Sequence, residues 1–263
     1  MHRTRPIGRA ELGFRGAFEL AGTLPAGPRL AIVGARASLH ALTARVPGLV
    51  AAAHARGFTI VSGGAIGVDA AVHRAALAQD VPQLAVLPCG PDRVYPSVHA
   101  ELFAAIAARA NSGLLFARPR GATPTRATFV SRNAIVIALV DACVVLQAEL
   151  RSGSETTGKL ALRANKQLAA VPGTRGCAAL IGAGAHAFAI DDDDALAAWL
   201  DGRARARAWP PHLAELRERL RAAGGAGATL DQLGGPLAAI VLFEAEALGL
   251  VAEPSPGRWV ALA

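Results

Sequence analysis

Short apolar runs alternate with longer amphipathic segments through most of the chain. The apolar runs predict strands at Arg29–Val33, Phe58–Val61, Leu84–Leu87, Leu114–Phe116, Ala142–Leu146 and Gln167–Val171. The amphipathic segments predict helices at Thr43–Arg56, Val68–Gln79, Ala100–Arg109, Arg132–Leu139, Thr156–Asn165 and Cys177–Ala185. Because this alternation is typical of parallel βαβ units buried on both faces, it predicts an α/β fold with a doubly wound, mostly parallel sheet.

The two ends of the chain follow different patterns. Residues 1–28 are rich in Gly and Pro and weakly periodic, so we expect an N-terminal extension before an α/β domain at residues 29–200. Residues 201–211 are polar, rich in Arg and closed by two prolines, as in a linker. Residues 212–263 are then expected to form a second, smaller domain.

This C-terminal segment has the pattern of a winged-helix-like module. Helices are predicted at His212–Ala222, from Thr229 and at Leu237–Leu248, and a hairpin turns at Pro254–Gly257. The third helix carries two Glu and no Lys or Arg. Since a recognition helix without cations is poorly suited to phosphate, we favour docking onto another protein over DNA binding for this module.

Composition and charge narrow the class of protein. Of the 263 residues, 52% are hydrophobic, which excludes a disordered or fibrous chain. Lys and Arg number 27 against 20 Asp and Glu, and this net charge of +7 attracts polyanions. All of these cations except Lys159 and Lys166 are Arg, which contacts phosphate in a bidentate manner and stacks on bases. A compositional bias of the genome explains the preference for Arg equally well.

The sequence carries no sign of export or membrane insertion. No stretch is long and apolar enough for a membrane span, and no apolar core follows the basic N-terminus. The cysteines Cys89, Cys143 and Cys177 lie far apart and form no CxxC pair. Because this spacing argues against disulfides and a zinc site, we expect reduced thiols, a cytoplasmic protein and no metal.

Glycine-rich segments follow four of the predicted strands. They are Gly34–Arg36, Ser62–Gly64, Cys89–Gly90 and Ser152–Ser154. The carboxyl ends of parallel strands meet at one edge of the sheet, where ligands of doubly wound folds bind. Since these segments also carry basic and hydroxyl side chains, they predict an anion site at that edge.

One of these segments has the spacing of a phosphate-binding loop. Gly153–Lys159 (GSETTGK) matches GxxxxGK, but Leu160 stands where Ser or Thr would hold Mg²⁺. We therefore disfavour nucleotide hydrolysis, although such a helix N-terminus binds phosphate without a metal. A plain helix start capped by Ser154 or Thr156 explains the segment equally well.

A second glycine-rich segment lacks the spacing for a dinucleotide. Gly63–Gly67 (GGAIG) does not match GxGxxG, so we expect no NAD and no other cofactor. Asp69 and His73 lie four residues apart on the following helix. We favour a helix-dipole partner and a surface histidine over a pair of ligands or an acid/base pair.

Cations surround an aromatic residue in the segment Arg120–Asn133 (RGATPTRATFVSRN). Arg120, Arg126 and Arg132 flank Phe129, as in a platform on which single-stranded bases stack. A solvated loop with one buried Phe is the alternative interpretation.

Six segments together resemble a known family. They are Ile32–Ser38 (IVGARAS), Ile60–His73 (IVSGGAIGVDAAVH), Ala85–Pro96 (AVLPCGPDRVYP), Phe129–Asn133 (FVSRN), Ser152–Ser154 (SGS) and Val171–Gly173 (VPG). In this order they resemble the DprA (Smf) family of DNA-processing proteins of bacterial natural transformation. The resemblance implies an extended Rossmann-like fold, sequence-independent binding of single-stranded DNA, homodimerisation and loading of RecA onto the strand. It implies no catalytic activity.

The resemblance also implies a set of DNA-binding residues. In it Arg36 grips phosphate, Phe129 stacks on a base, and Lys159 lines the pocket. The full set is Gly34, Arg36, Ser62, Gly63, Gly64, Arg126, Phe129, Arg132, Asn133, Ser152, Gly153, Ser154, Thr156 and Lys159.

The chain departs from the family pattern at several positions. Val130 replaces a Pro, Ala134 an Arg, Phe116-Ala117 a Ser-Glu pair, and Gln147 a Glu. About 28 residues precede the first predicted strand, so we do not expect the helical N-terminal domain common in the family.

Two other functions remain open. One is a phosphoribohydrolase that acts on nucleoside monophosphates, with Glu155 as the assisting carboxylate, and the other is a nucleotide-sensing module.

Overall fold

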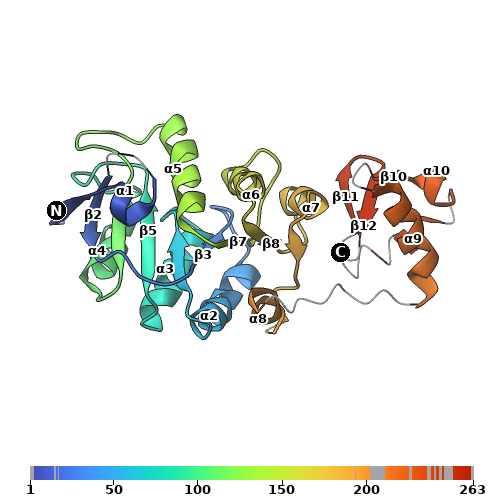
Figure 1. Ribbon diagram of the computed structural model, residues 1–263, viewed down its shortest axis with the longest axis horizontal. Coiled ribbons are helices and arrows are strands. Elements are labelled where there is room, and N and C mark those ends of the chain that lie inside the picture. Colours follow the sequence, from blue (N-terminus) through green and yellow to red (C-terminus); the bar gives the residue numbers. More distant parts are fainter. Residues whose placement is uncertain are drawn as a thin grey trace.

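The computed structural model describes residues 3–14, 16, 18–192, 194–201, 211–224, 227–235, 238–239, 241–242, 245 and 251–261. Within these residues, nine strands form one sheet in the order β1-β2-β6-β5-β4-β3-β7-β8-β9. Helices cover both faces of this sheet (Figure 1). The arrangement confirms the predicted doubly wound α/β fold.

Parallel strands make up the centre of the sheet. Their bounds are β3 Arg29–Val33, β4 Thr59–Ser62, β5 Gln83–Leu87, β6 Gly113–Phe116, β7 Ala142–Val145, β8 Gln167–Ala170 and β9 His186–Ala187. The register pairs Leu30 with Ile60 of β4 on one side and with Ala142 of β7 on the other. The strand β3 thus joins segments that lie far apart in the sequence.

Helices pack on both faces because successive strand residues point to opposite sides. On one face Ala31 and Val33 pack in the same cluster as residues of α5, α6 and α7, and on the other Leu30 and Ile32 pack with residues of α2, α3 and α8. A third cluster joins β5 and β6 to α4. The bounds are α2 His40–His54, α3 Val68–Ala78, η1 Ser97–His99, α4 Ala100–Ala108, α5 Arg126–Leu139, α6 Gly153–Arg163, α7 Arg175–Gly182 and α8 Ala195–Leu200.

Two helices begin earlier than the sequence pattern predicted. The helix α5 begins at Arg126 instead of Arg132, because Thr125 and Thr128 form a reciprocal capping box. The helix α6 begins at Gly153 instead of Thr156, because Ser152 caps it by accepting a hydrogen bond from the Glu155 amide. The predicted caps Ser154 and Thr156 were therefore wrong.

The N-terminal segment adds strands that the sequence analysis did not predict. The strand β1 (Thr4–Ile7), the short helix α1 (Arg9–Leu12) and the strand β2 (Phe18–Gly22) all precede residue 29. The strand β2 pairs antiparallel with both β1 and β6. Part of the N-terminal extension therefore belongs to the sheet of the α/β domain.

The C-terminal segment forms a second cluster. Here α9 (Ala214–Ala223), η2 (Pro211–Leu213) and α10 (Leu230–Leu233) accompany a sheet in the order β10-β12-β11. The three strands of this sheet, within the described residues, are β10 Ala228–Thr229, β11 Val251–Ser255 and β12 Arg258–Ala261. The strands β11 and β12 are the predicted hairpin. Most of the predicted helix Leu237–Leu248, and the linker residues 202–210, lie outside the described residues, so the winged-helix-like module stays a prediction.

The C-terminal sheet contacts the α/β domain. The strand β11 packs against α7, as Figure 1 shows. Val260 of β12 belongs to the same apolar cluster as Leu180 and Ile181 of α7.

Two further observations concern the described residues as a whole. The thiols of Cys89, Cys143 and Cys177 are free and buried. In the part of the chain that the structure describes, no helix combines the length and the apolar character needed to cross a membrane.

Candidate nucleic-acid interface

A cleft opens between two neighbouring strands whose following helices pack on opposite faces of the sheet. The strand β3 continues into α2 on one face of the sheet, whereas its neighbour β7 continues into α6 on the other face. Such a switch point leaves a crevice at the carboxyl ends of the two strands. The cleft measures about 310 Å³. Its lining comprises Val33, Gly34, Ala35, Arg36, Ala65, Asp69, Phe129, Arg132, Asn133, Val136, Glu149, Ser152, Gly153, Ser154 and Thr157.

The loop after β3 forms one wall of the cleft, and its path depends on two glycines, Gly34 in the loop itself and Gly67 at the N-cap of α3. A Cβ atom at Gly34 would overlap the side chain of Val68. A Cβ atom at Gly67 would overlap the carbonyl oxygens of Ala35 and Arg36, and Gly67 has a positive φ of 87°. The two glycines therefore let the loop lie directly against the start of α3 and carry Arg36 to the mouth of the cleft.

Arg132 forms the floor. Its side chain is buried at 6% exposure, and its Nη1 atom lies 3.8 Å from the Asp69 carboxylate. Its Nε atom finds no hydrogen-bond partner among the described residues. Burial lowers the pKa of Arg132, and the Asp69 charge opposes this shift. A buried guanidinium with an unsatisfied N–H favours an anionic or carbonyl-bearing ligand.

The position of Arg132 depends on the loop after β4. A Cβ atom at Gly63 would overlap the Arg132 guanidinium, so only glycine leaves room for this side chain. The Asp69 carboxylate accepts hydrogen bonds from the amides of Gly63 and Ala65, at 3.1 and 3.4 Å. His99 donates from Nδ1 to the Gly64 carbonyl at 3.1 Å. These contacts fix the loop on which the guanidinium lies.

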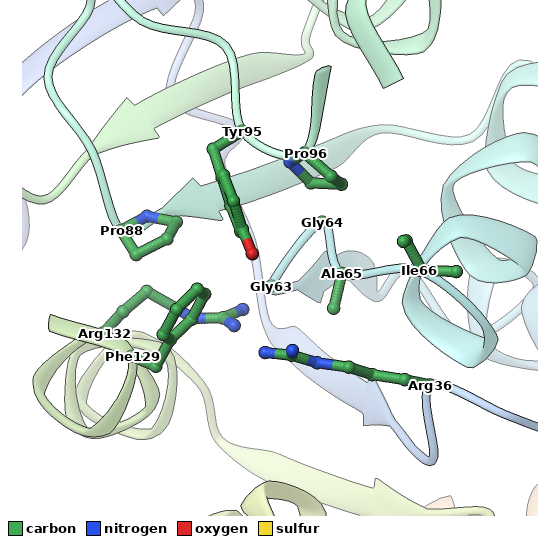
Figure 2. Close-up of a pocket in the computed structure, with 10 residues that line it drawn as sticks. All are labelled: Arg36, Gly63, Gly64, Ala65, Ile66, Pro88, Tyr95, Pro96, Phe129 and Arg132. Atoms are coloured by element: carbon green, nitrogen blue, oxygen red, sulfur yellow. The ribbon is translucent and has the colours of Figure 1, made fainter. Parts of the chain in front are cut away.

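Two aromatic rings and one guanidinium meet at the mouth of the cleft (Figure 2). The Phe129 ring lies 5.5 Å from the Tyr95 ring, between centroids, at an interplanar angle of 59°. The Arg36 guanidinium lies 5.0 Å from the Phe129 centroid. Arg36, Phe129 and Arg132 line, together with Tyr95, Pro96 and Ile66, a small adjoining pocket. The arrangement places flat apolar surface beside two cationic groups.

The N-terminus of α6 forms the opposite wall. Ser152, Gly153 and Ser154 line the cleft at the cap and the first two helical positions. Asn133 donates from Nδ2 to the Gly153 carbonyl at 3.3 Å and so ties α5 to this helix start. The free amides at a helix N-terminus attract anions.

The structure brings ten of the predicted site residues together. They are Gly34, Arg36, Gly63, Gly64, Phe129, Arg132, Asn133, Ser152, Gly153 and Ser154. The remaining four lie outside the linings of the cleft and the adjoining pocket. Ser62 is buried and donates to the Ile32 carbonyl, and Thr156 donates to the Ser152 carbonyl within α6.

The other two of these four residues are cations. Lys159 forms an ion pair with Glu155 at 2.7 Å, so its charge is engaged inside α6. Arg126 is the exposed first residue of α5. The predicted placement of Lys159 in the pocket lining was wrong, because the helix starts three residues earlier than the sequence pattern indicated.

Three further interpretations of the sequence need correction. His73 is fully buried instead of lying on a helix surface, and it donates from Nδ1 to Gln83 Oε1 at 2.7 Å. Asp69 holds the loop after β4 and pairs with Arg132, beyond any role at the helix dipole. The segment Cys89–Gly90 does not line the cleft, because Gly90 packs against the backbone at Pro119.

Sequence reasoning missed Tyr95 and Ile66 in the adjoining pocket. Tyr95 is the only tyrosine of the chain and follows β5 by eight residues, in a segment without periodicity. Its contact with Phe129 arises from the fold alone. The one available signal was an aromatic residue in a loop at the carboxyl edge of the predicted sheet.

The fold and the cleft define a Rossmann-like α/β protein with a crevice at its switch point. Comparison with known proteins identifies the family. Residues 14–199 match the family described as DNA recombination-mediator protein A, and the chain therefore belongs to this family.

Curated relatives cover the same part of the chain. The DNA processing protein DprA of Mycobacterium tuberculosis is 39% identical over 170 residues, which are 62% of this chain and 43% of the relative. The DprA protein of Streptococcus pneumoniae is 32% identical over 173 residues, 63% of this chain and 60% of the relative. The chain thus matches less than two thirds of the length of these relatives.

Two solved structures share the fold. DNA processing protein A of Helicobacter pylori, which binds single-stranded DNA, has a TM-score of 0.65 and 27% identity over 76% of this chain and 97% of that chain. The DprA structure of Streptococcus pneumoniae has a TM-score of 0.65 and 26% identity over 73% of each chain.

Proposed function

We propose that this chain binds single-stranded DNA without sequence preference and serves as a recombination mediator. One observation carries the proposal: the buried Arg132, with an unsatisfied Nε, underlies a cleft bounded by Arg36, Phe129 and the N-terminus of α6. Family membership and the DNA-binding relative from Helicobacter pylori support it.

Phosphate is the group that fits the walls of the cleft. Arg36 is exposed at the mouth, and the α6 amides at Gly153 and Ser154 face it from the other side. A phosphate between them would accept charge-assisted hydrogen bonds from both. Because phosphate contacts carry no information about the bases, binding through these walls would be independent of sequence.

The aromatic rings explain a preference for single strands. A base stacked on Phe129 or Tyr95 must unstack from its neighbours in the DNA strand. In a duplex this would also break the base pair, whereas a single strand has no base pair to lose. Stacking is worth about 1–3 kcal/mol per base, and every base offers a face for it. Duplex DNA would reach the cleft only through its phosphates and would bind more weakly.

The role we propose is non-catalytic. Glu155, the carboxylate considered for a phosphoribohydrolase, accepts from the Arg151 amide at 2.5 Å, pairs with Lys159 and does not line the cleft. Glu155 is therefore not placed to activate a water molecule for hydrolysis of the bond between nucleobase and ribose. Loading of RecA, homodimerisation and a cytoplasmic location belong to the same proposal and rest on the family.

The test is fluorescence anisotropy of a labelled oligo-dT titrated with the chain at two salt concentrations, with a duplex of equal length as the control. We expect tight, salt-sensitive binding to the single strand and weaker binding to the duplex. In Arg36→Ala, affinity should fall equally for all sequences, and the slope of log K against log salt should fall by about 0.7. Binding of AMP in preference to the oligonucleotide would favour a nucleotide sensor and contradict the proposal.

A further inference from the structure

Three arginines outside the cleft lining lie at the same edge of the sheet. Arg93 follows β5, Arg151 precedes α6 after β7, and Arg175 begins α7 after β8. All three are exposed. Because loops that follow parallel strands lie at the carboxyl edge, the strand order sets these side chains on both sides of Arg36, with Arg93 towards β6 and Arg151 and Arg175 towards β9.

No carboxylate engages these three cations. Among the described residues, Arg93, Arg151 and Arg175 form no ion pair. Some other arginines of the domain are engaged, since Arg109 pairs with Asp80 at 3.1 Å and Arg56 pairs with Asp201 at 2.8 Å. The charges of Arg93, Arg151 and Arg175 are therefore available to a ligand.

Most carboxylates of the carboxyl edge are already engaged. Asp92 accepts from the Gly121 amide at 2.9 Å, Asp69 holds Arg132, and Glu155 holds Lys159. Glu149 and Glu101 are exceptions: Glu149 is exposed and lines the cleft, and Glu101 is exposed in the first turn of α4. Between β5 and β8 the exposed Arg36, Arg93, Arg151 and Arg175 still outnumber these two carboxylates.

We infer that Arg93, Arg151 and Arg175 extend the cleft into a basic lane, which carries the phosphates of a single DNA strand across the carboxyl edge of the sheet. The inference rests on the proposed function and adds the path and the length of the bound strand. The DNA strand then runs from the loop after β5, across the cleft at the end of β3, to the loop after β8. The cleft then holds one part of the strand, and the outer arginines hold the flanking phosphates.

The length of the lane follows from the strand spacing. From β5 to β8 there are four steps between neighbouring strands, in the order β5-β4-β3-β7-β8. At about 4.8 Å per step, the lane spans about 19 Å. Since phosphates lie about 3.4 Å apart even along one strand of a stacked duplex, a lane of this length contacts several nucleotides. A dinucleotide, which has a single internucleotide phosphate, would occupy the cleft and leave the ends of the lane empty.

The experiment compares a short and a long oligonucleotide, dT2 and dT20, on wild type and on the double variant Arg151→Ala/Arg175→Ala. We expect the variant to bind dT20 about three- to tenfold more weakly at low salt, with the salt slope reduced by about 1.4 for two lost phosphate contacts. Binding of dT2 should stay within about twofold of wild type. The matched control is Arg163→Ala, because Arg163 is exposed at the opposite end of α6, about 16 Å from its start.

The outcomes separate the two proposals. A wild type that binds neither oligonucleotide overturns the proposed function and the lane with it. A wild type that binds dT20 with a salt slope unchanged in the double variant overturns the lane alone. A control variant that loses as much affinity for dT20 as the double variant also overturns the lane, because the effect would then follow net charge and not position.

Discussion

The guanidinium carbon of Arg36 lies 5.0 Å from the centroid of the Phe129 ring. These residues belong to the loop after β3 and to the first turn of α5, and each is a candidate contact for DNA. The cation covers the ring and so shields it from water. We expect a base that stacks on Phe129 to take the place of the guanidinium, which would then bind the adjacent phosphate.

Phe129→Leu should separate stacking from charge. We expect binding of oligo-dT to weaken by about 1–3 kcal/mol per lost stack and the preference for single strands over duplex to fall. The salt slope should remain that of wild type, because no phosphate contact is lost. Anisotropy titrations at several salt concentrations measure both quantities. Phe58→Leu, at a half-buried phenylalanine beside the amino end of β4, is the matched control, and equal losses in both variants would contradict the stacking role.

Gly63→Ala should act through Arg132. Because a methyl group at Gly63 would overlap the Arg132 guanidinium, we expect this variant to weaken DNA binding about as much as Arg132→Ala does. The double variant should be no weaker than either single one, since both changes remove the same group. Gly8→Ala, where a Cβ meets nothing within 4 Å, is the control. Additive losses of affinity would show that Gly63 acts independently of Arg132.

Glu149→Gln should strengthen binding. Glu149 is an exposed carboxylate in the lining of the cleft, so its charge repels a bound phosphate. We expect affinity for oligo-dT to rise about two- to fivefold at low salt and the gain to shrink as salt screens the charge. The same substitution at the exposed Glu218 of α9 should leave affinity unchanged. A loss of affinity in Glu149→Gln would place the carboxylate among the groups that hold the ligand.

Acid should destabilise the fold through His73. Burial lowers the pKa of this histidine below its usual value of 6.5, so the unfolded chain binds the proton first as the pH falls. The stability that depends on neutral His73 is therefore present above pH 6.5 and is lost below it, by up to about 1.4 kcal/mol per pH unit. Urea denaturation between pH 7.5 and 5 should show this loss in wild type, and a smaller one in His73→Gln. Equal slopes in the two proteins would contradict the assignment.

The sequence was sufficient to predict the bounds of an element where the pattern of apolar residues matches the pattern of burial. The strand β3 has the predicted bounds, Arg29–Val33, because a run of buried apolar residues stops at the glycine that opens the next loop. The edge strand β1 was missed because two of its four residues are exposed and one is Pro6, which weakens any strand pattern. The first turns of α5 were missed because none of residues 126–131 is buried and half of them are polar, and a Thr-Thr capping box defines the start of the helix.

The candidate site was predictable to the extent that it follows strand ends. Arg36 and the segments at Gly63 and Ser152 were found because the carboxyl ends of parallel strands converge. The contacts of Tyr95 with Phe129 and of Asp69 with Arg132 depend on how helices pack across the sheet, which spacing along the chain does not specify. The ion pair that engages Lys159 depends on the helical phase of α6 and was missed with it.

The hydrogen-bonded pair β3 and β7 forms the boundary between two halves of the sheet. In the strand order, β4, β5 and β6 lie on one side of this boundary and β8 and β9 on the other. The cleft takes Arg36 and Arg132 from the first half and the start of α6 from the second. A DNA strand bound in the proposed cleft would therefore contact both halves, and DNA at 100 times its dissociation constant would stabilise the native chain by about 2.7 kcal/mol. The midpoint of thermal unfolding should therefore rise when oligonucleotide is added, because the ligand would hold the two halves of the sheet together.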